Sequence, residues 1–145
     1  MIRNEREYQE ALRQIAGEEA IAQQRGTYHD MGLTPEEVDR VMGPTLSFRA
    51  QLIEEVDWYE RVRRRDFEAI HSLTAVGRLL IAARIANGLG QKDLAERLGV
   101  SEAQVSRDEH NEYHGVTLDR AQRILEHLGE TITTRIEEKP ASIAG

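Results

Sequence analysis

Two histidines and a glutamate stand at alternate positions, and their side chains are of the types that bind metal ions. They form the run His110-x-Glu112-x-His114. Alternate residues of a helix point in widely different directions, and catalytic zinc motifs use other spacings. The sequence therefore predicts neither a metal site in this run nor a bound cofactor.

Other groups that could catalyse a reaction are not arranged for it. The carboxylate pairs Glu36–Glu37 and Glu54–Glu55 are adjacent, so on a helix they diverge and cannot act as an acid and base couple. Nothing arranges serine and histidine as a triad, no phosphate-binding loop motif occurs, and the chain has no cysteine. We therefore expect a protein that is not an enzyme.

The composition indicates a small helical protein. The 145 residues carry 19 Lys and Arg against 26 Asp and Glu, a formal net charge of −7, and only 5% are aromatic. A core with few aromatics must use Leu, Ile, Val and Ala, which suits packed helices. No apolar run approaches the roughly 20 residues that span a bilayer, and the opening MIRNEREYQE is too charged for a signal peptide. We expect a soluble, cytoplasmic protein without a membrane partner.

The first positioning element is a helix predicted over 5–25. Asn4 and Glu7 have the spacing of a capping box, in which each side chain satisfies a free backbone N–H group of the first turn. Apolar residues then recur at helical spacing, and Gly26 is the predicted end of the helix.

Two more helices are predicted in the first half of the chain. Thr34 followed by Pro35 begins a short helix, which Gly43-Pro44 ends, and a long helix follows over about 46–65. Residues 1–71 hold 10 basic and 15 acidic residues, so acidity is concentrated here. This half is predicted to be an accessory, partner-binding region.

The second half predicts a compact helical domain over 72–129. Its helices are separated by short connections that contain glycine, and cap residues begin the later ones. The expected helices span 74–87, 91–98, 101–110 and 117–128.

A single strand is predicted within the last part of the chain, 130–145. In residues 131–136, β-branched residues dominate, and Ile132, Thr134 and Ile136 share one face. No second strand-like run exists to pair with it. We therefore expect these three residues to mediate dimerisation by strand pairing between two subunits. The alternative is dimerisation through the amino-terminal helices, and both can operate. The predicted fold is all-α with this one terminal strand.

Residues 91–110 have the pattern of a helix-turn-helix. Leu94 and Leu98 lie one turn apart on the first helix, and the small Ala95 lets a second helix cross closely. Gly99 suits a turn position with positive φ. The other positions are an apolar residue to fill the corner, a hydroxyl cap and an apolar core residue: Val100, Ser101 and Val105.

With these residues the chain resembles the Xre (lambdoid-repressor-like) helix-turn-helix family, over about 74–129. The matches are Arg84 seven positions before Gln91, the run LA-x-x-LGVS, the VS-R of the second helix, and Glu109. The resemblance implies a five-helix-type DNA-binding domain with a buried ion pair between Arg84 and Glu109. Such burial is plausible because a core Arg needs a fully hydrogen-bonded carboxylate partner.

The resemblance also implies which residues touch DNA. Base edges would be met by the second, recognition helix through Glu102, Ala103, Gln104, Ser106 and Arg107. Arg107 suits guanine, Gln104 suits adenine, and Glu102 can accept from cytosine, although such side chains can equally be only solvated. Phosphate contacts are expected from Arg78, Gln91, Lys92 and Ser101, and Gln91 is also expected to cap its helix.

Three features depart from the family's pattern. Gly90 stands where a Ser or Thr cap is usual, and Asp108 stands where an apolar residue is usual. Either Tyr113 folds back to fill that place, or the end of the recognition helix packs differently. Residues 72–128 hold only 7 basic against 8 acidic residues, so one domain should bind DNA weakly and dimerisation should supply the rest.

The opening IRNEREYQEAL, followed by a helix ending near Tyr59-Glu60, resembles HigA-type antitoxins. That resemblance implies a homodimeric repressor of its own operon that also neutralises a toxin, commonly a small ribonuclease. The predicted function is therefore sequence-specific binding of double-stranded operator DNA. The alternative is a protein–protein adaptor whose helix-turn-helix no longer binds DNA and whose acidic half binds a basic partner.

Overall fold

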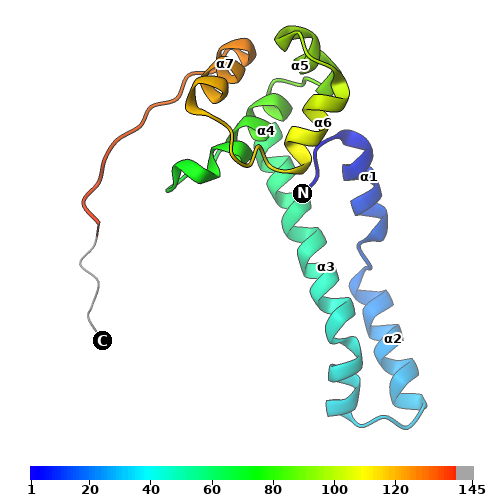
Figure 1. Ribbon diagram of the computed structural model, residues 1–145. Coiled ribbons are helices and arrows are strands. Elements are labelled where there is room, and N and C mark those ends of the chain that lie inside the picture. Colours follow the sequence, from blue (N-terminus) through cyan, green and yellow to red (C-terminus); the bar gives the residue numbers. More distant parts are fainter. Residues whose placement is uncertain (140–145) are drawn as a thin grey trace.

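The protein is a chain of seven α-helices and one short 3₁₀ helix over the residues that the structure, a computed structural model, describes, 1–139 (Figure 1). The end of the predicted last part of the chain, residues 140–145, lies outside them. The elements in order are α1 (Glu5–Gln14), α2 (Glu18–Asp30), α3 (Pro35–Arg63), η1 (Leu73–Ala75), α4 (Val76–Ala86), α5 (Gln91–Leu98), α6 (Glu102–His110) and α7 (Leu118–Leu128).

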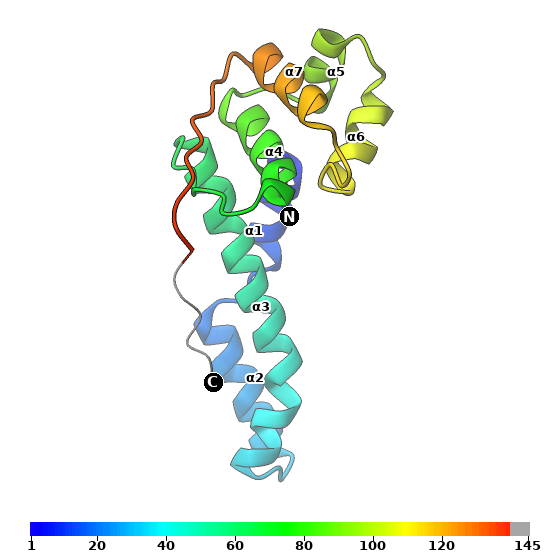
Figure 2. The same cartoon turned by 60° about the vertical axis from the view of Figure 1, so that its left-hand side comes forward.

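These helices form a compact group and a long arm. Helices α4 to α7 pack together, while α1 and α2 run antiparallel to α3, and the α2–α3 loop lies at the end far from that group (Figures 1 and 2). The α1 end of the arm meets the group, so the chain's beginning lies beside α4 and α6. We call residues 1–63 the arm.

The prediction of one helix over 5–25 is wrong. Helix α1 ends at Gln14, because its C-cap Ile15 is extended with ψ 106°, and Gly17 is the N-cap of α2, which continues through Gly26 to Asp30. The break is stabilised from a distance, because Arg49 on α3 donates a hydrogen bond of 2.7 Å to the carbonyl of Ala16. A carbonyl in the link between two helices has no intrahelical partner, and no local pattern reveals that Arg49 supplies one.

The predicted stop at Gly43-Pro44 is also wrong, because α3 continues through it. The predicted helix start at Thr34 is confirmed, and Thr34 and Glu37 form a capping box there. A proline inside a helix costs about 3 kcal/mol through a lost hydrogen bond and a ring clash. Pro44 and Arg40 are both exposed, so water can bind the freed carbonyl, and burial of Met42 and Leu52 on either side offsets the cost.

The strand predicted over 131–136 is absent, and the described chain contains no strand at all. After α7 the backbone leaves the domain as an extended segment (Figure 1, orange to red). The expected dimerisation residues Ile132, Thr134 and Ile136 are all exposed there. Alternating β-branched residues favour extended backbone, but a strand also needs a ladder partner, and residues 1–139 supply none.

One hydrophobic core connects the arm to α4–α7. Ile2, together with Tyr59 and Val62 of α3, belongs to the same buried cluster as Ile81 of α4 and Leu94 of α5. The predicted regions 1–71 and 72–129 therefore share their packing. Because this core is closely packed, a change in the position of the arm must shift the helices that pack against it.

Gly77 of α4 lies against the turn that joins α6 to α7. A Cβ added to it would stand 1.8 Å from the carbonyl oxygen of Glu112. In this turn Glu112 and Tyr113 both have positive φ, 50° and 53°, which is uncommon for residues with side chains. Tyr113 is buried, and its burial holds the turn against α4.

Candidate nucleic-acid interface

Helices α5 and α6 form the helix-turn-helix; the bounds predicted for α5 are confirmed, and α6 begins one residue later than predicted, with Ser101 as its N-cap. Gly99 ends α5 with φ 68°, and the Ser101 hydroxyl accepts a 3.1 Å hydrogen bond from the Gln104 backbone N–H. Leu94 and Val105 are buried between the two helices. Val100, however, does not fill the corner, because 39% of it is exposed.

Behind α6 lies the ion pair of Arg84 and Glu109, which are 2% and 1% exposed. The guanidinium binds the carboxylate through two nitrogens, and the second bond, Nη2 to Oε2, measures 2.8 Å. Arg84 also donates to the carbonyls of Leu89, at 2.7 Å, and Arg3, at 2.9 Å. No buried side-chain polar atom in residues 1–139 lacks a hydrogen-bond partner, so this pair is fully satisfied.

Gln91 joins this network. Its Nε2 donates to Glu109 Oε2 at 2.7 Å, so its side chain faces the ion pair. The prediction that Gln91 caps its helix is wrong, because the N-cap is Gly90, whose backbone N–H donates to Asp93 at 2.7 Å. Asp93 thus provides half of a capping box, which partly compensates for the missing cap oxygen. A phosphate contact by Gln91 stays a prediction.

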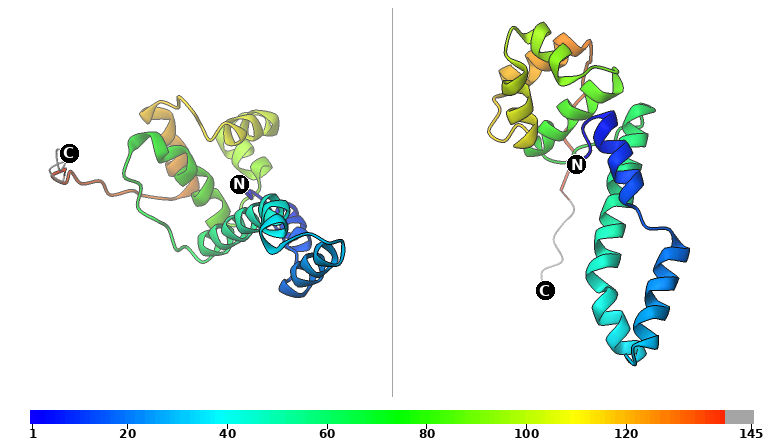
Figure 3. Two further views of the ribbon diagram at one scale, coloured as in Figure 1. Left: turned by 90° about the horizontal axis from the view of Figure 1, so that it is seen from below. Right: turned by 90° about the vertical axis from the view of Figure 1, so that its right-hand side faces the viewer.

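Helices α5 and α6 lie side by side in the domain, and α6 carries the residues predicted to meet bases (Figure 3, right, yellow-green). Glu102, Ala103 and Arg107 are exposed, and Gln104 and Ser106 are half-buried. Arg107 Nη2 donates to Gln104 Oε1 at 3.0 Å. The two side chains best suited to base recognition are thus in contact.

Asp108, the acidic departure in the recognition helix, has partners on both sides. Its Oδ2 accepts from Arg120 of α7 at 2.6 Å, and its Oδ1 accepts from Gln104 at 3.0 Å. Tyr113 is buried nearby, and its backbone N–H donates to the Asp108 carbonyl at 2.7 Å. The sequence analysis did not identify Arg120. The signal was an acidic residue on α6 without an evident role and a basic residue in the first turn of α7, whose charges are complementary.

The predicted phosphate contacts differ in their surroundings. Lys92 and Ser101 are exposed at the first turns of α5 and α6, where backbone N–H groups also favour an anion. Arg78 is exposed on α4, but its guanidinium lies 5.8 Å from the centre of the Trp58 ring. A phosphate contact would therefore compete with a cation–π interaction for Arg78.

The run His110-x-Glu112-x-His114 lies at the end of α6 and in the following turn. Among residues 1–139 no group of three or more acidic or histidine residues is placed to hold a metal ion.

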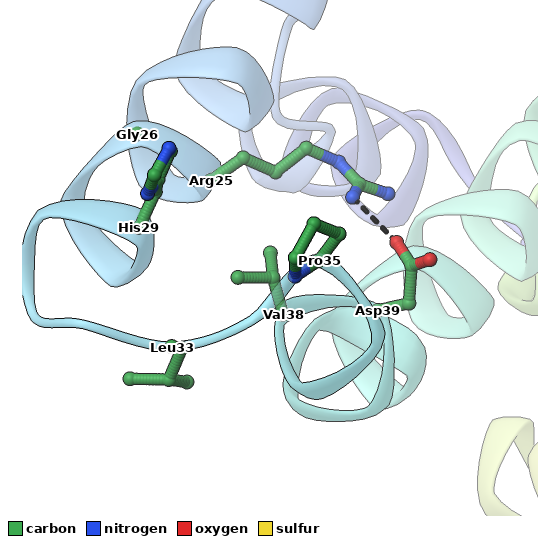
Figure 4. A pocket seen from close by; sticks show the side chains of 7 residues that line it. All are labelled: Arg25, Gly26, His29, Leu33, Pro35, Val38 and Asp39. Atoms are coloured by element: carbon green, nitrogen blue, oxygen red, sulfur yellow. Dashed lines mark hydrogen bonds and ion pairs between the residues drawn. The ribbon is translucent and has the colours of Figure 1, made fainter.

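The arm has a shallow pocket at its tip, between α2 and α3 (Figure 4). It is lined mostly by carbon atoms, from Leu33, Pro35 and Val38, and an Arg25–Asp39 ion pair of 2.8 Å lies at its edge. Nothing in this pocket matches a site predicted from the sequence.

The comparisons with known proteins agree with this geometry. Residues 80–134, from α4 to beyond α7, match the helix-turn-helix family model. This is a DNA-binding regulatory domain and not an enzyme family, so the match supports a DNA-binding transcription regulator of the Xre type. No curated protein and no solved structure was found to match the chain. In residues 1–139, no helix combines the length and apolar character needed to cross a bilayer.

Proposed function

We propose that the protein is a sequence-specific repressor that binds operator DNA through α6. The observation that carries this proposal is the exposed Arg107, in contact with Gln104 on the outward face of a helix in the matched region. The opposite face of α6 is held by buried Val105 and Glu109, so its outer side chains stand on a rigid element. Rigid placement is what direct reading of base edges requires.

We further propose that the repressor is an antitoxin that regulates its own operon and binds its toxin through the arm. Helix α2 buries none of its residues, and Met31, Val41 and Phe48 of the arm are large, apolar and exposed. Exposed apolar residues rimmed by charge are typical of protein interaction sites. The excess of acidic residues in 1–71 favours a basic toxin.

The repressor is proposed to act as a homodimer. With 7 basic and 8 acidic residues in 72–128, a single domain attracts phosphate weakly. Two linked domains on two half-sites would raise the effective affinity without new contacts.

A salt-titrated binding assay on DNA from the chain's own promoter tests the DNA-binding role. Specific binding should weaken steeply with salt, with a log–log slope of about −0.9 for each phosphate neutralised. Unrelated DNA of equal length is the control. Equal affinity for both DNAs, or no binding to either, would contradict a sequence-specific repressor.

One observation favours a second candidate, a protein–protein adaptor. The domain's charge is slightly acidic, and an adaptor needs no phosphate-binding surface. The adaptor would bind a basic partner through the arm and ignore DNA. The same assay separates the two, because only the repressor binds its promoter.

The toxin role is tested by co-expression with the product of a neighbouring small ribonuclease-like gene. The complex should co-purify, and ribonuclease activity should fall on binding. Phe48→Asp, at a 52% exposed position on the arm, should weaken this complex and spare promoter binding. Leu73→Asp, at a 66% exposed position outside residues 1–71, is the matched control and should leave the complex intact. If Phe48→Asp has no effect, or no neighbouring product is inhibited, the antitoxin assignment is wrong.

A further inference from the structure

A chain of four side chains joins α7 to the outward face of α6. Arg120 Nη2 donates to Asp108 Oδ2 at 2.6 Å, and Gln104 Nε2 donates to Asp108 Oδ1 at 3.0 Å. Arg107 Nη2 then donates to Gln104 Oε1 at 3.0 Å. Asp108 stands in the middle of this chain, between a fixed neighbouring helix and the two residues best suited to read bases.

The chain of contacts determines how the Gln104 amide is turned. An ionised carboxylate only accepts hydrogen bonds, and a guanidinium only donates them. With Asp108 at one end and Arg107 at the other, only one orientation gives both contacts, with the NH₂ group toward Asp108. The flipped amide would place its oxygen against the Asp108 carboxylate and its NH₂ group against the Arg107 guanidinium.

Asp108 is itself held in place. Its side chain is 16% exposed, against 41% for Arg120, so the pair is partly shielded from water. Its backbone carbonyl accepts the N–H of Tyr113, which is buried. An unpaired acid on a recognition helix would repel DNA phosphates, whereas the pair with Arg120 is neutral. The Asp108 carboxylate can therefore orient the Gln104 amide with little electrostatic repulsion of DNA.

We propose that Asp108 is a positioning residue for base recognition: through Gln104 it fixes the guanidinium of Arg107, which then selects guanine at the base pair it faces. This inference rests on the proposed sequence-specific repressor. Only one nitrogen of Arg107 contacts Gln104, so donors remain for the O6 and N7 acceptors of guanine. Because Gln104 holds the Arg107 guanidinium in place before DNA binds, the Arg107 side chain loses less conformational freedom on binding.

Asp108→Asn is the sharpest test, because it keeps the shape and removes the charge. The new amide would turn its oxygen to Arg120 and its NH₂ group to Gln104, which forces the Gln104 amide to turn its own oxygen away from Arg107. Asp119→Asn is the matched control. It makes the same chemical change in the first turn of α7, at a residue without a side-chain hydrogen bond or ion pair among residues 1–139.

The full-length wild type and both variants would be compared by binding-site selection on randomised duplex DNA, with melting temperatures measured in parallel. We expect Asp108→Asn to lose guanine preference at one position of each half-site by about 5-fold or more, the smallest discrimination that a bidentate contact provides. Preferences at other positions and affinity for unrelated DNA should change no more than in Asp119→Asn. Should Asp108→Asn not fold, Gln104→Ala breaks the same chain between Asp108 and Arg107 and should lose the same guanine preference.

An unchanged guanine preference in Asp108→Asn would overturn the inference while leaving the repressor intact. Uniformly weaker binding to all sequences, with a lower melting temperature, would also overturn it, because that pattern marks a merely structural residue. A wild-type protein without any base preference would instead overturn the proposed function, and this inference with it.

Discussion

The carbonyl oxygen of Arg3 lies 2.9 Å from Nη2 of Arg84, 81 positions further along the chain. The first residues of the arm thus complete the hydrogen bonds of a guanidinium buried in the DNA-binding domain. Ile2, next to Arg3, is 3% exposed and belongs to the shared core. The arm and the helix-turn-helix are therefore expected to unfold together.

Arg84→Ala should destabilise the protein by about 3–5 kcal/mol, because it leaves the carboxylate of Glu109 buried without its charged partner. Thermal unfolding followed by circular dichroism measures this. Arg123→Ala, an exposed arginine on α7, is the control and should cost less than about 0.5 kcal/mol. Similar melting temperatures for the two variants would show that the ion pair contributes little to stability.

Ile2→Ala should cost about 2–5 kcal/mol, the usual range for truncating a large buried aliphatic side chain. Because Ile2 shares its core with α4 and α5, the loss should appear in a single transition of the whole protein. Leu12→Ala, at a 41% exposed position on α1, is the matched control and should change little. Two separate transitions in Ile2→Ala would mean that the arm and the domain fold independently.

Arg107→Ala should weaken promoter binding by about 1–3 kcal/mol and leave the melting temperature unchanged, because the side chain is exposed and its loss removes a base contact. Fluorescence anisotropy with promoter and unrelated DNA measures both affinities. Arg13→Ala, the control, removes an equal charge from the arm and should leave the difference in affinity between promoter and unrelated DNA unchanged. If Arg107→Ala prefers promoter over unrelated DNA as strongly as the wild type does, Arg107 does not contact bases specifically.

Glu130 gives a prediction about pH. Burial alone would raise its pKa, but hydrogen bonds from Arg65, at 2.7 Å, and Asn87, at 2.8 Å, outweigh burial and hold its pKa below the ordinary 4.5. A carboxyl group with a lowered pKa in the folded state stabilises that state above its unfolded pKa. This stabilisation is lost as the pH falls through the folded pKa.

Glu130→Gln should therefore lower stability by up to about 1 kcal/mol at pH 7, because the partner Arg65 is half exposed and the pair is screened. The difference from the wild type should shrink as the pH falls below about 4.5. Chemical unfolding at several pH values checks this, with Glu96→Gln, at an exposed site on α5, as the control. A difference that stays constant down to pH 3 would contradict the assignment.

Features set by short-range signals were predictable from the sequence. Gly99 and Ser101 determine how α5 ends and α6 begins, and in the structure they are the C-cap of α5 and the N-cap of α6. The Arg84–Glu109 pair was expected from the family resemblance, and the structure brings the two side chains together.

Features that depend on distant residues were not predictable. Arg49 stabilises the break between α1 and α2, and Arg120 binds the acid at Asp108, yet neither acts on its sequence neighbours. The strand over 131–136 failed for a related reason: its residue pattern is local, but a strand requires a partner elsewhere.

Gly77 shows where routine stabilisation by protein engineering would fail in this fold. Replacing a glycine within a helix by alanine can gain up to about 1 kcal/mol, so a design procedure would consider Gly77, in the first turn of α4, early. Here the added methyl group would collide with the carbonyl oxygen of Glu112 and push the α6–α7 turn away from α4. Such a variant should lose thermal stability, and a library of random substitutions at position 77 should retain almost only glycine.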